Sequence, residues 1–280
     1  MKRSVVLALW IVALACVVPP RVAWAQGWTL PQGQNWVRVG LLAQVTDERY
    51  FIDGRRIPYF FEGHNETLGF IFDWRRGLTD RLEVDLQLPY FGISFNDLAA
   101  NRSSGGIGDI RLGLRYNVLL DPLVVTLGTT VKFPTGEFDN DAETIPVGEG
   151  QWDYEFQLEL ARSLWPRPGW VNAQIGYRLR TENQETGIDH GNELFWSAEA
   201  GYEVVRRVSL KVRGRGLHGG ETTSFGFPFP SLQRSAVYLE PGVIVAVSTV
   251  GSVEFAVPVS LSGQNWPAGP IFILGYFQQF

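Results

Sequence analysis

The segment DIRLGLRYNV, residues 109–118, alternates without a break between polar or small residues and apolar ones. A β-strand sends successive side chains to opposite faces, whereas the step of about 100° in a helix scatters odd and even positions around the axis. The segment therefore predicts a strand with one polar and one apolar face, and the apolar face comprises Ile110, Leu112, Leu114, Tyr116 and Val118.

The same period of two recurs along the chain and predicts about twelve strands. Their ranges are 34–46, 64–75, 81–94, 107–119, 123–134, 151–164, 170–182, 191–205, 208–218, 234–248, 251–262 and 269–280. The connections are alternately long, as in 47–63 and 135–150, and short, as in 120–122 and 206–207. Long loops at one end and tight turns at the other are typical of a transmembrane antiparallel β-barrel of the Gram-negative outer membrane, with the short turns in the periplasm.

Strand length separates this barrel from a soluble β-sandwich, the alternative fold that would alternate in the same way. The predicted strands have about 10–14 residues, whereas a tilted membrane strand needs about 9–11 and a globular strand averages about 5–6. An even number of strands also places both termini on the periplasmic side. The sequence thus favours an all-β membrane barrel.

Residues 1–25 have the parts of a cleaved secretory signal peptide: a basic start, an apolar run and the small-x-small site Ala23-Trp24-Ala25. Cleavage would leave 26–280 as the outer-membrane barrel domain. Because the leader holds three basic and no acidic residues, its loss would shift the formal net charge from −5 to −8. A lipoprotein lipidated at Cys16, the one cysteine of the chain, is the alternative.

The composition argues against several functional classes. The net charge of −5 disfavours a nucleic-acid partner, which would need a basic face. Three histidines and one cysteine leave little for a metal site, so neither a metal nor a cofactor is expected.

No enzyme activity is expected either. A membrane-embedded hydrolase is the alternative, but no serine lies within two positions of His64, His190 or His218. Asp189 beside His190 could imitate a protease pair, and the acidic residues at 139–143 could bind a divalent cation. Solvated loop residues are the simpler interpretation of both.

The bilayer interior cannot solvate a charge, so the apolar face of each strand is expected to meet lipid and the charged face to line a lumen. Charges within the predicted strands share the inward parity: Glu83, Asp85, Asp109, Arg111, Arg115, Lys132, Asp153, Glu155, Glu159, Arg178, Arg180, Glu193, Glu199, Glu203, Lys211, Arg213, Arg215, Glu240 and Glu254.

Acidic strands lie beside basic ones in this order, which predicts ion pairs between neighbouring strands. If residues 165–168 form a four-residue turn, Glu155 faces Arg178 and Asp153 faces Arg180. Such pairs either neutralise a polar wall or form a selectivity ladder for a solute, and the sequence leaves both interpretations open.

The last strand ends in Phe280, with Tyr276, Leu274 and Phe272 on the same face. This pattern resembles the C-terminal signature of outer-membrane proteins, which implies that Phe280 and Tyr276 form an assembly signal for the barrel-assembly machinery. The lipid bilayer and lipopolysaccharide are the other expected partners. Candidates for aromatic girdles at the membrane surfaces are Trp36, Trp74, Tyr90, Tyr116, Trp152, Tyr154, Trp170, Tyr177, Trp196, Tyr202 and Tyr276.

Two short motifs carry a family resemblance. Gly105-Gly106-Ile107-Gly108-Asp109 opens one strand, and Lys132-Phe133-Pro134-Thr135-Gly136 ends the next. Together with Gly77-Leu78-Thr79-Asp80 ahead of Leu88-Pro89-Tyr90, they resemble the meta-pathway phenol-degradation family of outer-membrane proteins, over roughly residues 65–280. The resemblance implies a barrel of this size and uptake of hydrophobic or aromatic compounds, and it assigns no ligand-binding residue.

The sequence predicts a channel for passive uptake of small solutes. Twelve strands about 4.8 Å apart give a backbone diameter of roughly 24 Å, which inward side chains narrow to about 10 Å or less. Such a barrel passes small molecules or is plugged by its own side chains. A closed structural or assembly barrel without conductance is the alternative from another functional class. The short piece at residues 26–33 is a candidate plug for the lumen.

Overall fold

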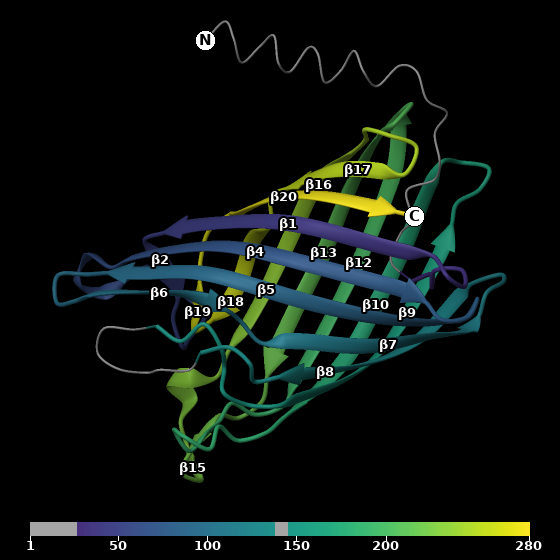
Figure 1. Ribbon diagram of the computed structural model, residues 1–280. Coiled ribbons are helices and arrows are strands. Elements are labelled where there is room, and N and C mark those ends of the chain that lie inside the picture. Colours follow the sequence, from purple (N-terminus) through teal and green to yellow (C-terminus); the bar gives the residue numbers. More distant parts are fainter. Residues whose placement is uncertain (1–26, 138–144) are drawn as a thin grey trace, which may run out of the picture.

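The computed structural model describes residues 27–137 and 145–280, and within them the twelve predicted strands form one closed antiparallel barrel (Figure 1). In order around the wall these are β1 (Asn35–Thr46), β4 (His64–Gly77), β5 (Leu82–Asn96), β7 (Ile110–Leu119), β8 (Val124–Phe133), β9 (Asp153–Ser163), β10 (Gly169–Arg180), β12 (Glu193–Val205), β13 (Val208–Gly219), β16 (Ser235–Ala246), β17 (Gly251–Ala256) and β20 (Ile271–Gln279). The predicted signal peptide and the acidic residues at 139–143 lie outside the described residues.

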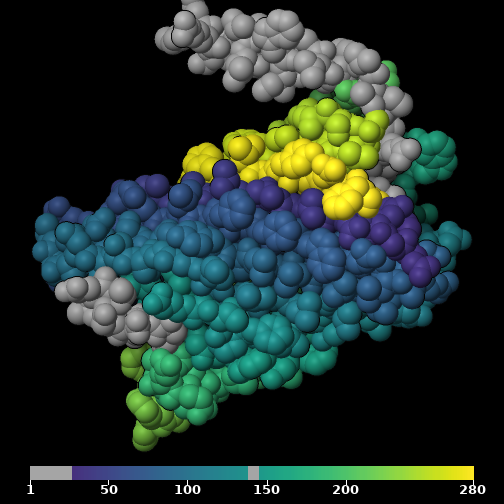
Figure 2. Space-filling view, in the orientation of Figure 1, coloured from purple at the N-terminus to yellow at the C-terminus, as the bar shows by residue number. Residues whose placement is uncertain are grey.

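Strand β20 pairs with β1 and so closes the ring, with Gly40 opposite Gly275. Figure 2 shows this seam from outside, where the yellow C-terminal strand lies against the purple first strand. No helix in the described part of the chain is long and apolar enough to cross a bilayer.

Shorter elements build the extracellular end. Strand β6 (Asn101–Ile107) pairs with β5, and β18 (Val259–Gln264) continues β17 and pairs with β16. The loops carry two small sheets. One is formed by β2 (Glu48–Tyr50), β3 (Arg56–Pro58) and β19 (Trp266–Pro267), and the other by β11 (Ile188–Asp189), β14 (Thr223–Ser224) and β15 (Phe227–Pro228). Two 3-10 turns, η1 (Phe60–Glu62) and η2 (Pro230–Leu232), also lie in the loops.

The predicted strand at 251–262 is two strands in the structure. The ladder is interrupted at Val257 and Pro258, since proline has no N–H to donate to a neighbouring strand. The strand predicted from residue 107 begins at Ile110. The other predicted boundaries agree with the structure to within about three residues.

The barrel is built with its apolar side chains outward. Along β9, Glu155 is 3% exposed, while its neighbours Tyr154 and Phe156 are 41% and 55% exposed. A soluble sandwich would bury the aromatic rings and expose the carboxylate. The observed order is the one that a surrounding bilayer requires.

The C-terminal pattern lies on this outer face, where Phe280, Tyr276, Leu274 and Phe272 are all exposed. Eight of the eleven girdle candidates are also exposed there, but Trp170 is buried and that prediction is wrong. Its ring fills the space over Gly201, where a Cβ atom would lie 2.1 Å from it, and its Nε1 donates to Glu199 Oε1 at 2.9 Å.

Candidate functional site

The register of β9 and β10 sets the lumen charges opposite one another. Arg178 is the neighbour of Glu155 and Arg180 that of Asp153, which confirms the register predicted from a four-residue turn. Arg178 Nε lies 2.5 Å from Glu155 Oε1, and Arg180 Nε lies 3.3 Å from Asp153 Oδ1.

A first group of ion pairs, the periplasmic cluster, comprises Arg75, Glu83, Arg115 and Glu159. Arg115 lies between two carboxylates, with Nη1 2.7 Å from Glu83 Oε1 and Nη2 2.6 Å from Glu159 Oε2. Arg75 Nε lies 2.6 Å from Glu83 Oε1. Because β7 and β9 are separated by β8, the Arg115–Glu159 contact links next-nearest strands across the inside of the wall.

A second group, the extracellular cluster, comprises Asp109, Arg111, Lys132, Glu149, Asp153, Glu155, Arg178, Arg180, Glu193 and Arg234. Its centre is Glu149, which comes from the loop between β8 and β9 and reaches back into the barrel. The carboxylate pairs with Lys132, lies 2.9 Å from Arg180 Nη2 and lies 2.8 Å from Arg234 Nη1. Burial alone would raise the pKa of Glu149, but these cations hold it well below its usual range.

A third group, the mid-barrel cluster, comprises Arg38, Asp73, Glu199, Lys211, Arg213, Arg215, Glu240 and Glu254. Three cations share Glu240: Lys211 at 3.5 Å, Arg213 at 3.7 Å and Arg215 at 3.4 Å. Arg213 Nη2 makes a shorter contact of 2.6 Å with Glu199 Oε2.

Each cluster holds as many basic as acidic groups: two and two, five and five, and four and four. Equal numbers of acidic and basic groups are needed because removing one partner of a buried ion pair lowers the stability of the fold by about 3–5 kcal/mol.

Two of the predicted lumen charges stand outside these clusters. Asp85 lies against Gly113, where a Cβ would meet its carboxylate at 2.4 Å, and Glu203 Oε1 accepts the backbone N–H of Arg207 at 3.1 Å. The other seventeen candidates belong to the three clusters.

Sequence reasoning missed five members of the clusters. Arg38, Asp73 and Arg75 share the inward parity of their strands, so the same parity argument would have found them. Glu149 and Arg234 lie outside the strands, where a period of two gives no signal.

One sector of the inner wall is apolar, which the expectation of a uniformly polar lumen did not include. Leu42 of β1, Ile71 of β4, and Phe91 and Ile93 of β5 are half-buried and share the parity of Arg38 and Asp85. Leu42 and Phe91 meet over Gly69, where a Cβ would lie 2.7 Å from Leu42 Cγ and 3.0 Å from Phe91 Cε1. We call Leu42, Ile71, Phe91 and Ile93 the apolar wall.

The apolar wall faces charge. In a ring of twelve strands the opposite strand lies six positions away, so β10, β12 and β13 lie opposite β1, β4 and β5. Those opposite strands carry Arg178, Glu193 and Arg215 in their extracellular halves. The extracellular half of the lumen is therefore amphipathic.

The chain before β1 lies across the periplasmic end of the lumen. Leu30 and Thr29 are buried, and Leu30 N–H donates to Glu83 Oε2 at 2.8 Å. Asn117 accepts from Thr29 N–H at 3.1 Å and donates to the carbonyl of Gly27 at 3.2 Å. Residues 27–34, called here the N-terminal segment, thus occupy the position predicted for a plug.

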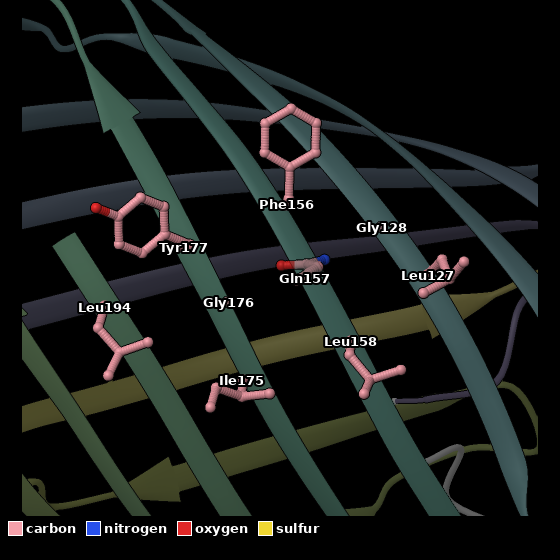
Figure 3. A pocket seen from close by; sticks show the side chains of 9 residues that line it. All are labelled: Leu127, Gly128, Phe156, Gln157, Leu158, Ile175, Gly176, Tyr177 and Leu194. Atoms are coloured by element: carbon pink, nitrogen blue, oxygen red, sulfur yellow. The ribbon is translucent and has the colours of Figure 1, made fainter. Parts of the chain in front are cut away.

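The outer face has a shallow hollow, drawn in Figure 3. Phe156 and Leu158 of β9 and Ile175 and Tyr177 of β10 border it. The lining is apolar and faces the bilayer, so the hollow belongs to the lipid-facing surface and not to the lumen.

In the part of the chain that the structure describes, no hydrogen bond joins a histidine ring to a serine, threonine or cysteine side chain. His64 contacts Asp47 and Glu66 at the extracellular end, and the carbonyl of His190 accepts the Thr222 hydroxyl. Burial lowers the pKa of His190 to about 4, and Arg180 and Arg234 add to this effect. Within residues 27–137 and 145–280 no cluster of His, Cys, Asp and Glu is suited to hold a metal.

Comparison with known proteins agrees with the barrel. A family model described as "Putative MetA-pathway of phenol degradation" matches residues 53–272. No curated protein matches the sequence significantly.

Solved structures match over most of the chain. An outer membrane channel from Pseudomonas putida F1 superposes with a TM-score of 0.80 at 18% identity, covering 93% of this chain and 100% of that one. The β domain of the Bordetella autotransporter BrkA gives 0.52 at 12% identity, with 89% and 100% covered. The translocator domain of autotransporter NalP from Neisseria meningitidis gives 0.50 at 9% identity, with 90% of each chain covered. At these identities the likeness shows the fold alone, an outer-membrane β-barrel.

Proposed function

The chain belongs to the family described as "Putative MetA-pathway of phenol degradation", and on this premise we propose that it is an outer-membrane channel for passive passage of small solutes that have an apolar part. The observation that supports this function is the amphipathic lumen, in which the apolar wall lies opposite Arg178, Glu193 and Arg215. A barrel that only needed a solvated interior would have no reason to keep Leu42 and Phe91 facing inward.

The chemistry of such a passage follows from the two faces. The apolar wall removes the hydrocarbon part of a solute from water, at about 25 cal/mol for each Å² buried. The opposite arginines interact with its polar group and keep the passage hydrated. Neither face binds a whole solute strongly, which permits exit as well as uptake. Aromatic compounds are the proposed class, since the structure resembles a channel and its family carries the name of phenol degradation.

Single-channel recording tests the proposal. The purified full chain in a planar bilayer is expected to conduct, and benzyl alcohol is expected to interrupt the current more than xylitol, a polyol of similar size. Phe91→Asn is expected to weaken the interruption about tenfold, as loss of about 1.4 kcal/mol of apolar contact would do. Leu98→Asn is the matched control, since it also replaces an apolar side chain with asparagine, but at an exposed loop position.

A closed barrel without conductance is the second candidate, and a specific observation favours it. The N-terminal segment covers the periplasmic end while Glu149 ties a loop across the extracellular end. Absence of any current, both from the full chain and from a chain lacking residues 27–32, would establish this candidate and refute the channel.

Assembly is proposed to depend on the C-terminal strand. Phe280, Tyr276 and Leu274 present an outward apolar row at the edge that closes against β1, where the barrel-assembly machinery would bind before closure. The lipid bilayer surrounds the finished barrel, and lipopolysaccharide is the proposed neighbour in the outer leaflet.

A further inference from the structure

The ionic groups of the three clusters are balanced in number but not in exposure. Of the eleven acids, nine have side chains no more than 9% exposed, whereas seven of the eleven cations are 16–40% exposed. The carboxylates lie against the wall, and the guanidinium groups stand in front of them. A solute in the lumen therefore meets arginine although the clusters carry no net charge.

Arg215 is the most exposed of these cations, with 40% of its side chain accessible. Its ion pair with Glu240 is long, at 3.4 Å, and that carboxylate is shared with Lys211 and Arg213. The guanidinium carbon lies 4.8 Å from the centre of the Tyr238 ring, which holds the group in place from one side. Arg215 is thus positioned by a ring, only partly neutralised and open to the lumen.

Arg215 lies across the lumen from the apolar wall. It lies on β13, six strands away from β5, which carries Phe91 and Ile93. Because a twelve-stranded barrel leaves about 10 Å or less between side chains of opposite walls, one small molecule can reach both. A cation on one side and an apolar surface on the other suit an anion with a hydrocarbon body.

We infer that the lumen is anion-selective and that Arg215, together with the apolar wall, forms a binding site for small carboxylates with an apolar body. This inference rests on the proposed channel function and narrows its substrate class. The carboxylate lies against the Arg215 guanidinium, whose planar donors match it in pairs, and the hydrocarbon part lies against Phe91 and Leu42.

The accessible acids are few and placed elsewhere. Glu149, 32% exposed, pairs with three cations in the extracellular cluster, and Asp73, 17% exposed, pairs with Arg38. Asp85, beside Gly113, and Glu203, which accepts the N–H of Arg207, lie in the periplasmic half. None of these carboxylates contacts Arg215.

The test combines ion selectivity with solute block in the full chain. In a planar bilayer with a KCl gradient, chloride is expected to permeate several-fold more readily than potassium, since one charge about 5 Å away changes local ion concentration about fourfold in a water-like medium. Benzoate is expected to block at lower concentration than benzyl alcohol, which has the same ring without the charge.

Arg215→Gln is expected to reduce the chloride preference and to abolish the advantage of benzoate, with conductance retained. Arg167→Gln, in an exposed periplasmic turn, is the control that removes one arginine outside the lumen. Cation preference, or equal block by both probes in the native channel, would overturn the inference and leave the channel function intact. Absence of any current would overturn both.

Discussion

The N-terminal segment should act as a removable obstacle at the periplasmic end, and Asn117 is the residue through which to test this. Replacing Asn117 with alanine removes two hydrogen bonds from Thr29 and one to the carbonyl of Gly27. At about 1 kcal/mol for each bond, the detached state of the segment should become about 100-fold more populated. Hydrogen bonds from Leu30 to Glu83 and from Arg75 to the carbonyl of Trp28 would remain.

A thiol at position 30 reports detachment. Cys16 lies in the predicted signal peptide, so after cleavage of that peptide Leu30→Cys introduces a single reactive thiol, at a buried site. Its reaction with a water-soluble maleimide should be slow in the otherwise native chain and about 100-fold faster with Asn117→Ala, because labelling proceeds through the detached state. Single-channel conductance should rise in parallel.

Asn172→Ala provides the matched control. Asn172 is also a buried inner-wall asparagine, but it donates to Glu199 on the neighbouring strand β12 and not to the N-terminal segment. Equal labelling rates in the Asn117→Ala and Asn172→Ala backgrounds, with both barrels folded by circular dichroism, would refute the assignment of this segment as the periplasmic closure.

Three further predictions concern the charges. Arg115→Gln should lower the free energy of unfolding in urea by about 3–5 kcal/mol, because Glu159 would remain buried without its cation, and adding Glu159→Gln should recover part of that loss. Glu149→Gln should make the extracellular loops more susceptible to protease, whereas lowering the pH from 7 to 5 should leave the native chain resistant, since a carboxylate with a depressed pKa keeps its stabilising charge until the pH falls well below its usual value. His190 has a pKa of about 4 in the folded chain and about 6.5 in the unfolded chain. The stability that its neutral form provides should therefore be fully present above pH 6.5 and be lost as the pH falls toward 4. His190→Gln should remove this pH dependence of the free energy of unfolding, measured by urea titration at several pH values.

The strands and their register could be predicted because polar and apolar residues alternate along each strand. The alternation in β7, β9 and β10 fixes which side chains share a face, and a four-residue turn then fixes the pairing of Glu155 with Arg178. The family resemblance, carried by short glycine-rich motifs, was confirmed by the match over residues 53–272.

The remaining features of the site could not be predicted from alternation, because they depend on contacts between distant strands, on loop residues and on which face of a strand is apolar. Arg115 reaches Glu159 past an intervening strand, and Glu149 arrives from a loop. In β5 the inward positions Phe91 and Ile93 are themselves apolar, so the rule that places apolar residues against lipid fails there. Trp170 turns inward because Gly201 on the next strand leaves room for its ring.

The sharing of Glu240 among Lys211, Arg213 and Arg215 also limits how relatives of this protein can diverge. A mutation that deletes the charge of Glu240 affects three contacts at once, so substitutions around it should be inherited as coordinated sets that keep the total charge of the group constant. Lineages that alter the solute they admit would then have to exchange whole groups of residues, while the lipid-facing surface varies one position at a time.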